Sequence, residues 1–215
     1  MASISVPEFK VILCGEYGVG KTSLFRRFTL DTFIDTSGYS NSQARQSTLG
    51  LDHASRKYEL DGFKTIKIQL WDTGGLERVA SMTNSYYKFA DAALLVFSLN
   101  SLESFHFISQ HLLEILSLAE NAKIFLVGNK SDKSLHEVSD SDIEMFMEQF
   151  PKFEGLYKVS CKNNTGVKEM FNEIAEKLAN TSYKSNLDAL KLHNQESSYV
   201  NESSSSNISD FCCAK

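Results

Sequence analysis

The chain has 215 residues, of which 42% are hydrophobic and only two are proline, so it is long enough for one α/β domain and too short for two comfortable ones. Its formal net charge of −5 argues against a nucleic-acid binder, because binding to a phosphate backbone needs a basic surface. No apolar run approaches a transmembrane helix or resembles a signal peptide, so we expect a protein of the cytosol.

Apolar runs of strand length alternate with amphipathic stretches of helix length. The expected strands are Val11–Cys14, Arg56–Leu60, Lys64–Trp71, Ala92–Ser98, Lys123–Val127 and Leu156–Ser160. The expected helices are Lys21–Phe28, Leu76–Lys88, Glu103–Leu118, Ser139–Gln149 and Val167–Ala179. This alternation predicts an α/β fold with a mainly parallel six-stranded sheet and helices on both faces. The turn at Asp61-Gly62 makes the second strand one antiparallel edge strand.

The segment Gly15-Glu16-Tyr17-Gly18-Val19-Gly20-Lys21-Thr22-Ser23 contains the pattern G-x-x-x-x-G-K-S/T directly after the first strand. The glycines let the backbone curl so that N–H groups point at phosphate oxygens, and the start of the next helix adds the positive end of its dipole. We expect Lys21 to neutralise the terminal phosphates and the Thr22 hydroxyl to hold Mg²⁺. A Gly-rich turn can exist without a ligand, but Lys-Thr at this spacing favours a P-loop that binds a nucleotide triphosphate.

The segment Trp71-Asp72-Thr73-Gly74-Gly75 follows the third expected strand. It places the Asp72 carboxylate where it could steady the Mg²⁺ of a P-loop nucleotide. The alternative is a turn that caps the following helix, and this role is compatible with the first.

A second polar segment, Asn129-Lys130-Ser131-Asp132, follows the next-to-last strand. A carboxylate here can accept both hydrogen bonds from the ring N–H and the exocyclic amine of guanine, a donor pair that adenine lacks. Asp132 therefore favours GTP over ATP, although the tetrapeptide taken alone could be an ordinary polar loop.

The order of these motifs resembles the small GTPases of the Ras superfamily, and particularly the Rab family, over residues 8–180 and the last four. Rab-like details are Thr48-Leu49-Gly50-Leu51-Asp52, Glu77-Arg78, Ser85-Tyr86-Tyr87, Leu94-Leu95-Val96-Phe97 and Ser104-Phe105. The resemblance implies the G domain of a P-loop NTPase over residues 1–180, with GTP or GDP and Mg²⁺ bound.

By the same resemblance, Thr48 coordinates Mg²⁺ in the GTP state and the Gly75 N–H donates to the γ-phosphate. Phe33 stacks edge-on against guanine, and Ser160-Cys161-Lys162 contact the base. The structural alternatives are a core aromatic for Phe33 and a helix-entry turn for Ser160–Lys162. The implied catalytic positions are Lys21, Thr48, Gly75 and Leu76.

Three departures from the family pattern affect the chemistry. Leu76 stands where relatives usually have the glutamine that orients the attacking water, and an aliphatic side chain has no donor or acceptor for this task. Tyr17 replaces a small P-loop residue next to the γ-phosphate and the path of an arginine finger. The stretch from Ile34 to Ser47 is longer than usual and rich in Ser, Asn and Gln.

The composition from residue 181 to 215 is rich in Ser and Asn, which predicts a disordered tail. Its ending, Cys212-Cys213-Ala214-Lys215, is similar to the paired-cysteine ending on which many Rab proteins receive two geranylgeranyl chains, enough for stable membrane anchoring. Unmodified thiols are the alternative. The tail carries no basic patch, so lipid chains and protein partners are expected to do the targeting.

These inferences predict a Rab-like GTP-binding switch in vesicle traffic, on the cytoplasmic face of an internal membrane and with a cytosolic pool. The implied partners of this monomer are effectors, exchange factors, GTPase-activating proteins and the prenylation machinery. Hydrolysis is expected to be slow because of Leu76. A protein that holds GTP and scarcely hydrolyses it is the alternative, whereas Asp132 disfavours an ATP-dependent kinase or ATPase.

Overall fold

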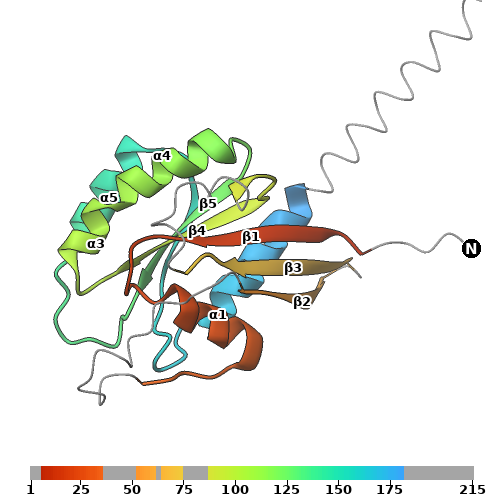
Figure 1. Ribbon diagram of the computed structural model, residues 1–215, viewed down its shortest axis with the longest axis horizontal. Coiled ribbons are helices and arrows are strands. Elements are labelled where there is room, and N and C mark those ends of the chain that lie inside the picture. The colour runs from red at the N-terminus through yellow and green to blue at the C-terminus, as the bar shows by residue number, and fades with distance from the viewer. Residues whose placement is uncertain (1–5, 36–51, 62–63, 75–86, 182–215) are drawn as a thin grey trace, which may run out of the picture. The chain divides into compact units, whose positions relative to one another are not determined.

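The computed structural model describes residues 6–35, 52–61, 64–74 and 87–181 (Figure 1). The chain divides into two compact units, Met1–Glu176 and Lys177–Lys215. The first unit holds a six-stranded sheet of order β2-β3-β1-β4-β5-β6. Among the helices of the described ranges, none is long and apolar enough to cross a membrane.

Five strands of the sheet are parallel, and the sixth is an antiparallel edge strand, as the alternation of elements predicted. The parallel strands are β1 (Glu8–Cys14), β3 (Lys64–Asp72), β4 (Ala92–Ser98), β5 (Lys123–Asn129) and β6 (Phe153–Lys158), and the antiparallel strand is β2 (Asp52–Leu60). Each residue of β4 is buried, which explains its unbroken apolar sequence.

β1 begins at Glu8, three residues before the predicted start, and both edge strands differ from their predicted bounds as well. β2 begins at Asp52, four residues before the predicted start, because it pairs with β3 along its whole length although most of its side chains are exposed. β6 spans Phe153–Lys158, so the prediction of Leu156–Ser160 was wrong at both ends. Ser160 instead forms an isolated antiparallel bridge with Thr165, which ends the parallel pairing.

The helices are α1 (Lys21–Leu30), α3 (Leu102–His106), α4 (Ile108–Leu118), α5 (Asp140–Gln149) and a last helix over residues 167–181. The prediction of one helix over Glu103–Leu118 was wrong, because the chain breaks at Phe107, whose ψ of −7° departs from helical geometry. The helix expected over Leu76–Lys88 lies outside the described residues except for its last two.

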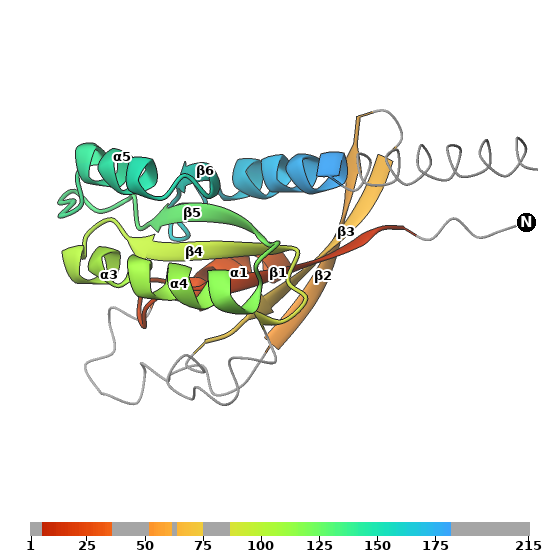
Figure 2. The same ribbon diagram turned by 90° about the horizontal axis from the view of Figure 1, so that it is seen from above.

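Helices cover both faces of the sheet (Figures 1 and 2). One face of β1 and β4 packs against α3, α4 and α5 in a cluster that includes Ile12, Leu95 and Ile115. On the other face α1 meets the last helix through Phe28 and Phe171, whose ring centroids are 4.9 Å apart. Alternate residues of each inner strand therefore face two apolar layers, and the loops after the strands remain available for a site.

Candidate functional site

The loop that joins β1 to α1 runs against the carboxyl edge of the sheet. Gly15, Gly18 and Gly20 have φ angles of 131°, 79° and 107°, in the region that favours glycine. A Cβ atom at Gly15 would lie 2.0 Å from the carbonyl oxygen of Val96 in β4, so no side chain fits there. The backbone can therefore curl into an anion-binding loop at this edge.

Lys21, the first residue of α1, supplies the positive charge of this loop. Its side chain is 5% exposed, and its ammonium donates hydrogen bonds to the carbonyl oxygens of Gly15 at 2.6 Å and Glu16 at 2.9 Å. The side chain thus folds back from the helix start over the loop backbone. An ammonium and the N–H groups of a helix N-terminus in one place suit a phosphate.

Asp72, the last residue of β3, is completely buried. Its Oδ1 accepts a hydrogen bond from the Gly74 N–H at 3.1 Å, whereas Oδ2 makes none to the residues that the structure describes. Burial raises the pKa of this carboxyl group. Three neighbours lower the same pKa in part: the Thr22 hydroxyl, the Gly74 N–H and the Lys21 charge. A buried carboxylate oxygen without a donor is costly, so this site suits a cation or its bound water.

Asp72 and Thr22 fit a Mg²⁺ ion that is shared with a phosphate. Across the described ranges, no group of three or more His, Cys, Asp and Glu side chains could hold a metal ion by itself. Mg²⁺ usually keeps several waters and is held by one or two carboxylates together with the phosphates of a substrate. One buried carboxylate and one hydroxyl beside the phosphate loop match that pattern.

Asn129, the last residue of β5, makes side-chain hydrogen bonds to three loops. Its Nδ2 donates to the carbonyl oxygen of Val19 at 2.9 Å, while its Oδ1 accepts from the N–H groups of Lys130 at 2.8 Å and Cys161 at 3.2 Å. The residue is 2% exposed, and a Cβ at Gly20 would lie 2.2 Å from its Nδ2. One buried amide therefore joins the P-loop to the segments after β5 and β6.

The Asp132 carboxylate is held by Ser160. The Ser160 hydroxyl donates to Asp132 Oδ1 at 2.7 Å and accepts a hydrogen bond from the Asn163 N–H at 3.0 Å. The bridge between Ser160 and Thr165 fixes the turn that carries this hydroxyl. Asp132 is thus oriented by contacts within the protein, and its carboxylate is half-buried.

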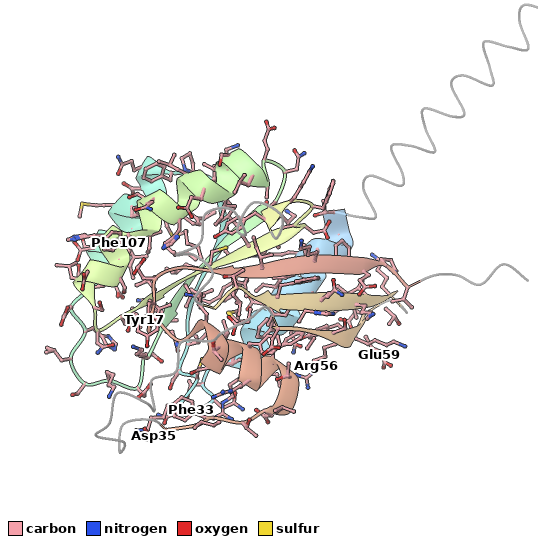
Figure 3. The ribbon with its side chains drawn as sticks, in the orientation of Figure 1. Tyr17, Phe33, Asp35, Arg56, Glu59 and Phe107 are labelled. Carbon is pink, nitrogen blue, oxygen red and sulfur yellow. The ribbon has the colours of Figure 1, made fainter. Side chains whose placement is uncertain are left out.

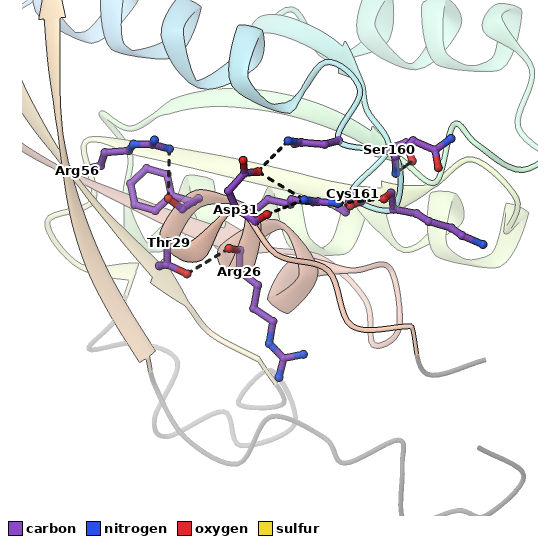
Figure 4. A network of polar contacts seen from close by, with 11 residues as sticks. Arg26, Thr29, Asp31, Arg56, Ser160 and Cys161 are labelled. Carbon is purple, nitrogen blue, oxygen red and sulfur yellow. Dashed lines mark hydrogen bonds and ion pairs between the residues drawn. The ribbon is translucent and has the colours of Figure 1, made fainter. Parts of the chain in front are cut away.

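Arg27 of α1 holds the segment after β6, a role that no motif in the sequence indicates. Its Nε donates to the carbonyl oxygen of Cys161 at 2.7 Å, and its Nη2 donates to that of Lys162 at 3.0 Å (Figure 4). Its Nη1 donates to the carbonyl oxygen of Asp31 at 2.8 Å, where α1 ends. Arginine spacing along a helix could not reveal these contacts, since both carbonyl groups come from a distant loop.

Phe33 is half-buried in the segment that follows α1 (Figure 3). Two residues later, the Asp35 carboxylate lies 3.8 Å from the Lys162 ammonium. This ion pair brings the Phe33 segment to the predicted base-contacting residues.

Two P-loop side chains lie at the outer side of the site. Tyr17 is 41% exposed, and the Glu16 carboxylate is 3.5 Å from Nε2 of the buried His111 of α4. The other ring nitrogen of His111 is 3.4 Å from the Glu114 carboxylate. Glu16 therefore contacts α4, a connection that the motif pattern did not suggest.

The structure brings together the predicted residues of the P-loop, Asp72, Asn129 to Asp132 and Ser160 to Lys162. In addition, Val19 is buried, Ser23 is half-buried on α1, and Lys130 has a φ of 67°. The remaining predicted residues, Thr48, Gly75, Leu76, Cys212 and Cys213, lie outside the described residues.

Comparison with known proteins agrees with this arrangement. The model of the Ras family matches residues 10–180. Ras-related protein YPTC6 of Chlamydomonas reinhardtii is 38% identical over 185 residues, which cover 84% of this chain and 80% of that protein. Ras-related protein Rab-1D of Dictyostelium discoideum is 39% identical over 176 residues, which cover 80% of each chain.

Proposed function

The chain belongs to the Ras family as a Rab-like small GTPase, and on this premise we propose that it is a GTP-binding molecular switch in vesicle and membrane traffic. The observation that carries the proposal is the Asn129 side chain, which joins the P-loop to the two segments expected to bind the base. A nucleotide has phosphates at one end and a base at the other. A site in which one buried side chain connects the loops for these two ends suits such a ligand.

The backbone N–H groups of residues 15–23 and the Lys21 ammonium would bind the phosphates of GTP or GDP. Mg²⁺ is assigned to Thr22 and Asp72, with Thr48 added in the GTP state by resemblance. The unsatisfied Asp72 Oδ2 supports this assignment, because it needs a cation or a water donor. When bound, Mg²⁺ neutralises charge on the phosphate oxygens.

Selectivity for guanine is assigned to Asp132, which Ser160 holds in place. Its carboxylate can accept two N–H donors that guanine presents and adenine does not. Asn129, Lys130, Cys161 and Lys162 would complete the base site, with the Phe33 ring against the edge of guanine.

The reaction is attack of water on the γ-phosphate of GTP, which gives GDP and phosphate. Lys21 and the Gly75 N–H would stabilise negative charge on the transferred group. Leu76 cannot orient the attacking water, so we propose that hydrolysis is slow. The exposed Tyr17 would obstruct an arginine finger and slow assisted hydrolysis as well.

A second candidate function is a binding module that stays loaded with GTP and scarcely hydrolyses it. Leu76 favours this alternative, since the side chain has neither a donor nor an acceptor. Measured turnover of preloaded GTP distinguishes the two.

Residues 1–180 would form the G domain and residues 181–215 a disordered tail. Two prenyl chains on Cys212 and Cys213 would anchor the monomeric protein to the cytoplasmic face of an internal membrane, with a cytosolic pool. Effectors would bind the GTP state, and exchange factors, GTPase-activating proteins and the prenylation machinery would be the other partners. The acidic net charge supports a role that does not involve nucleic acid.

The test is to purify the full-length chain under native conditions, denature it and identify the released nucleotide by anion-exchange chromatography. We expect GTP or GDP in amounts close to one per chain, and loss of this nucleotide in Asp132→Ala. The variant Asp140→Ala is a control, since this carboxylate lies on the surface and pairs with Lys158. Copurified ATP or ADP, or equal loss in both variants, would overturn the proposal.

A further inference from the structure

A pocket lies on the side of the sheet that carries α1, away from the P-loop. It encloses about 250 Å³ between the C-terminal end of α1, the edge strand β2 and the first turns of the last helix. Its titratable lining residues are Arg27, Asp31, Arg56, Lys57, Tyr58, Glu59 and Lys168. No residue predicted for nucleotide or lipid attachment lines it.

The charges of Arg27 and Asp31 in this lining are already compensated. Arg27 Nη1 is 3.5 Å from the Asp31 Oδ1, and the same oxygen accepts a hydrogen bond from the Asn164 side-chain amide at 2.8 Å (Figure 4). The remaining Arg27 donors go to backbone carbonyl groups. This pair therefore adds no net charge to the pocket.

The charges of Arg56 and Lys168 are not compensated in this way. Within the described ranges, neither side chain forms an ion pair, and Arg56 makes a long hydrogen bond of 3.4 Å from Nη1 to the carbonyl oxygen of Phe28. Side chains alternate along a strand, so Arg56 and Tyr58 share one face of β2, while Lys57 and Glu59, which also border the pocket, extend from the other face. The Arg56 cation therefore lies on the same face of β2 as Tyr58.

The Tyr58 hydroxyl is the third feature of this pocket. The residue is 9% exposed, and its hydroxyl oxygen is buried. Burial raises the pKa of this phenol to about 12, and the Arg56 side chain beside it acts in the opposite direction. The hydroxyl is therefore uncharged at neutral pH, so Tyr58 adds no negative charge beside Arg56.

We propose that this pocket binds a phosphate monoester through Arg56 and Lys168. A monoester carries about 1.5 to 2 negative charges at neutral pH, which matches two uncompensated cations, whereas a carboxylate carries one. The Arg56 guanidinium offers a planar set of donors that suits two phosphate oxygens. The same chemistry is found in a soluble sugar phosphate and in the headgroup of a phosphoinositide, and the experiment separates these sources.

The test uses the full-length chain loaded with GDP and Mg²⁺, so that phosphate probes do not compete for an empty P-loop. Inositol monophosphate and inorganic phosphate are titrated while backbone amide shifts are recorded by NMR. In parallel, the chain is sedimented with phosphatidylcholine vesicles that contain or lack phosphatidylinositol phosphate. The variants are Arg56→Gln and Lys168→Gln, and Lys152→Gln is the matched control, because Lys152 is exposed, carries the same charge and does not line the pocket.

We expect the shifts to centre on residues 56, 58, 164 and 168. The affinity should fall about tenfold, or ~1.4 kcal/mol, in Arg56→Gln and in Lys168→Gln, and it should be retained in Lys152→Gln. If the wild type binds the phosphoinositide vesicles and Arg56→Gln does not, the ligand is the lipid headgroup. Binding to the soluble probe without a gain on vesicles assigns a free phosphate ester. Shifts confined to the P-loop, equal losses in Lys152→Gln and Arg56→Gln, or no response to any probe would overturn the proposal. None of these outcomes depends on which base the nucleotide site selects.

Discussion

The side-chain amide of Asn129 donates a hydrogen bond of 2.9 Å to the carbonyl oxygen of Val19, a residue 110 positions earlier in the chain. The same amide accepts the N–H of Cys161, so the predicted phosphate-binding and base-binding loops share one buried connection. The position of the P-loop therefore depends on a residue that is not part of it.

Replacement of Asn129 by alanine should weaken nucleotide binding and stability together. The change leaves the Val19 carbonyl and two N–H groups without their partner, and each buried unsatisfied group costs about 1–3 kcal/mol. We expect nucleotide release at least roughly tenfold faster, measured with a fluorescent GDP analogue, and a lower urea midpoint. The matched control is Asn163→Ala, since only the backbone N–H of Asn163 has a role here. Unchanged release in Asn129→Ala would show that other contacts hold the loops.

Asp132 should determine the choice of base. Asp132→Asn should weaken GTP binding by about a thousandfold, since an amide N–H donor replaces a carboxylate acceptor that faces the guanine donors. The same variant should favour xanthosine triphosphate, which carries a carbonyl oxygen in place of the guanine amine. Competition titrations with GTP, ATP and xanthosine triphosphate measure both effects. Comparable affinity of the wild type for ATP and GTP would contradict this assignment.

Asp72→Asn should make the nucleotide-free, Mg²⁺-free protein more stable at neutral pH. Because burial raises the carboxyl pKa above its ordinary value of 3.8, the folded protein holds a proton in a pH window where the unfolded chain has lost it. The stability contributed by this group therefore falls as the pH rises through that window. Each unit of the shift corresponds to about 1.4 kcal/mol.

Urea unfolding of Asp72→Asn and wild type, repeated from neutral pH toward 3.8, checks this expectation. The advantage of the variant should shrink as the pH falls, because the wild-type carboxyl becomes neutral as well. The same variant should lose the dependence of nucleotide affinity on Mg²⁺. A wild type that is more stable than Asp72→Asn at neutral pH would mean that Lys21 and Thr22 more than offset the cost of burial.

Leu76→Gln should accelerate intrinsic hydrolysis several-fold, because the amide supplies the donor and acceptor that orient water. Single-turnover hydrolysis of preloaded GTP measures the rate without a partner protein. Leu76→Met is the matched control, since it changes shape without adding either hydrogen-bonding group. A wild type as fast as a glutamine-bearing relative in the same assay would mean that another residue positions the water.

Membrane attachment should depend on Cys212 and Cys213. We expect the double variant Cys212→Ser/Cys213→Ser to move from the membrane fraction to the supernatant when it is expressed in cells. Each single variant keeps one site, and one lipid chain gives only marginal binding, so an intermediate distribution should follow. A double variant that sediments like the parent would point to attachment by a protein partner.

The sequence predicts the inner part of the fold well, because buried parallel strands such as β4 carry continuous apolar runs. It misplaces β2 and β6, since the bounds of edge strands depend on hydrogen bonds to one neighbour rather than on side-chain burial. The glycine and lysine positions of the P-loop could be predicted from spacing alone. The contacts of Arg27 could not be predicted, because their acceptors are backbone carbonyl groups, which every residue carries. The ligand roles of Thr48, Gly75 and Leu76 remain predictions.

The hydrogen bonds from Arg27 to Cys161 and Lys162 also bear on how the protein is made. They connect residues 134 and 135 positions apart, so this part of the predicted base site cannot form until the chain has been synthesised beyond β6. Contacts this distant in sequence are slow to close during folding. If the proposed guanine site is correct, a growing chain that already carries its complete P-loop still lacks that site, and a ribosome-bound fragment that ends before residue 160 should not retain nucleotide.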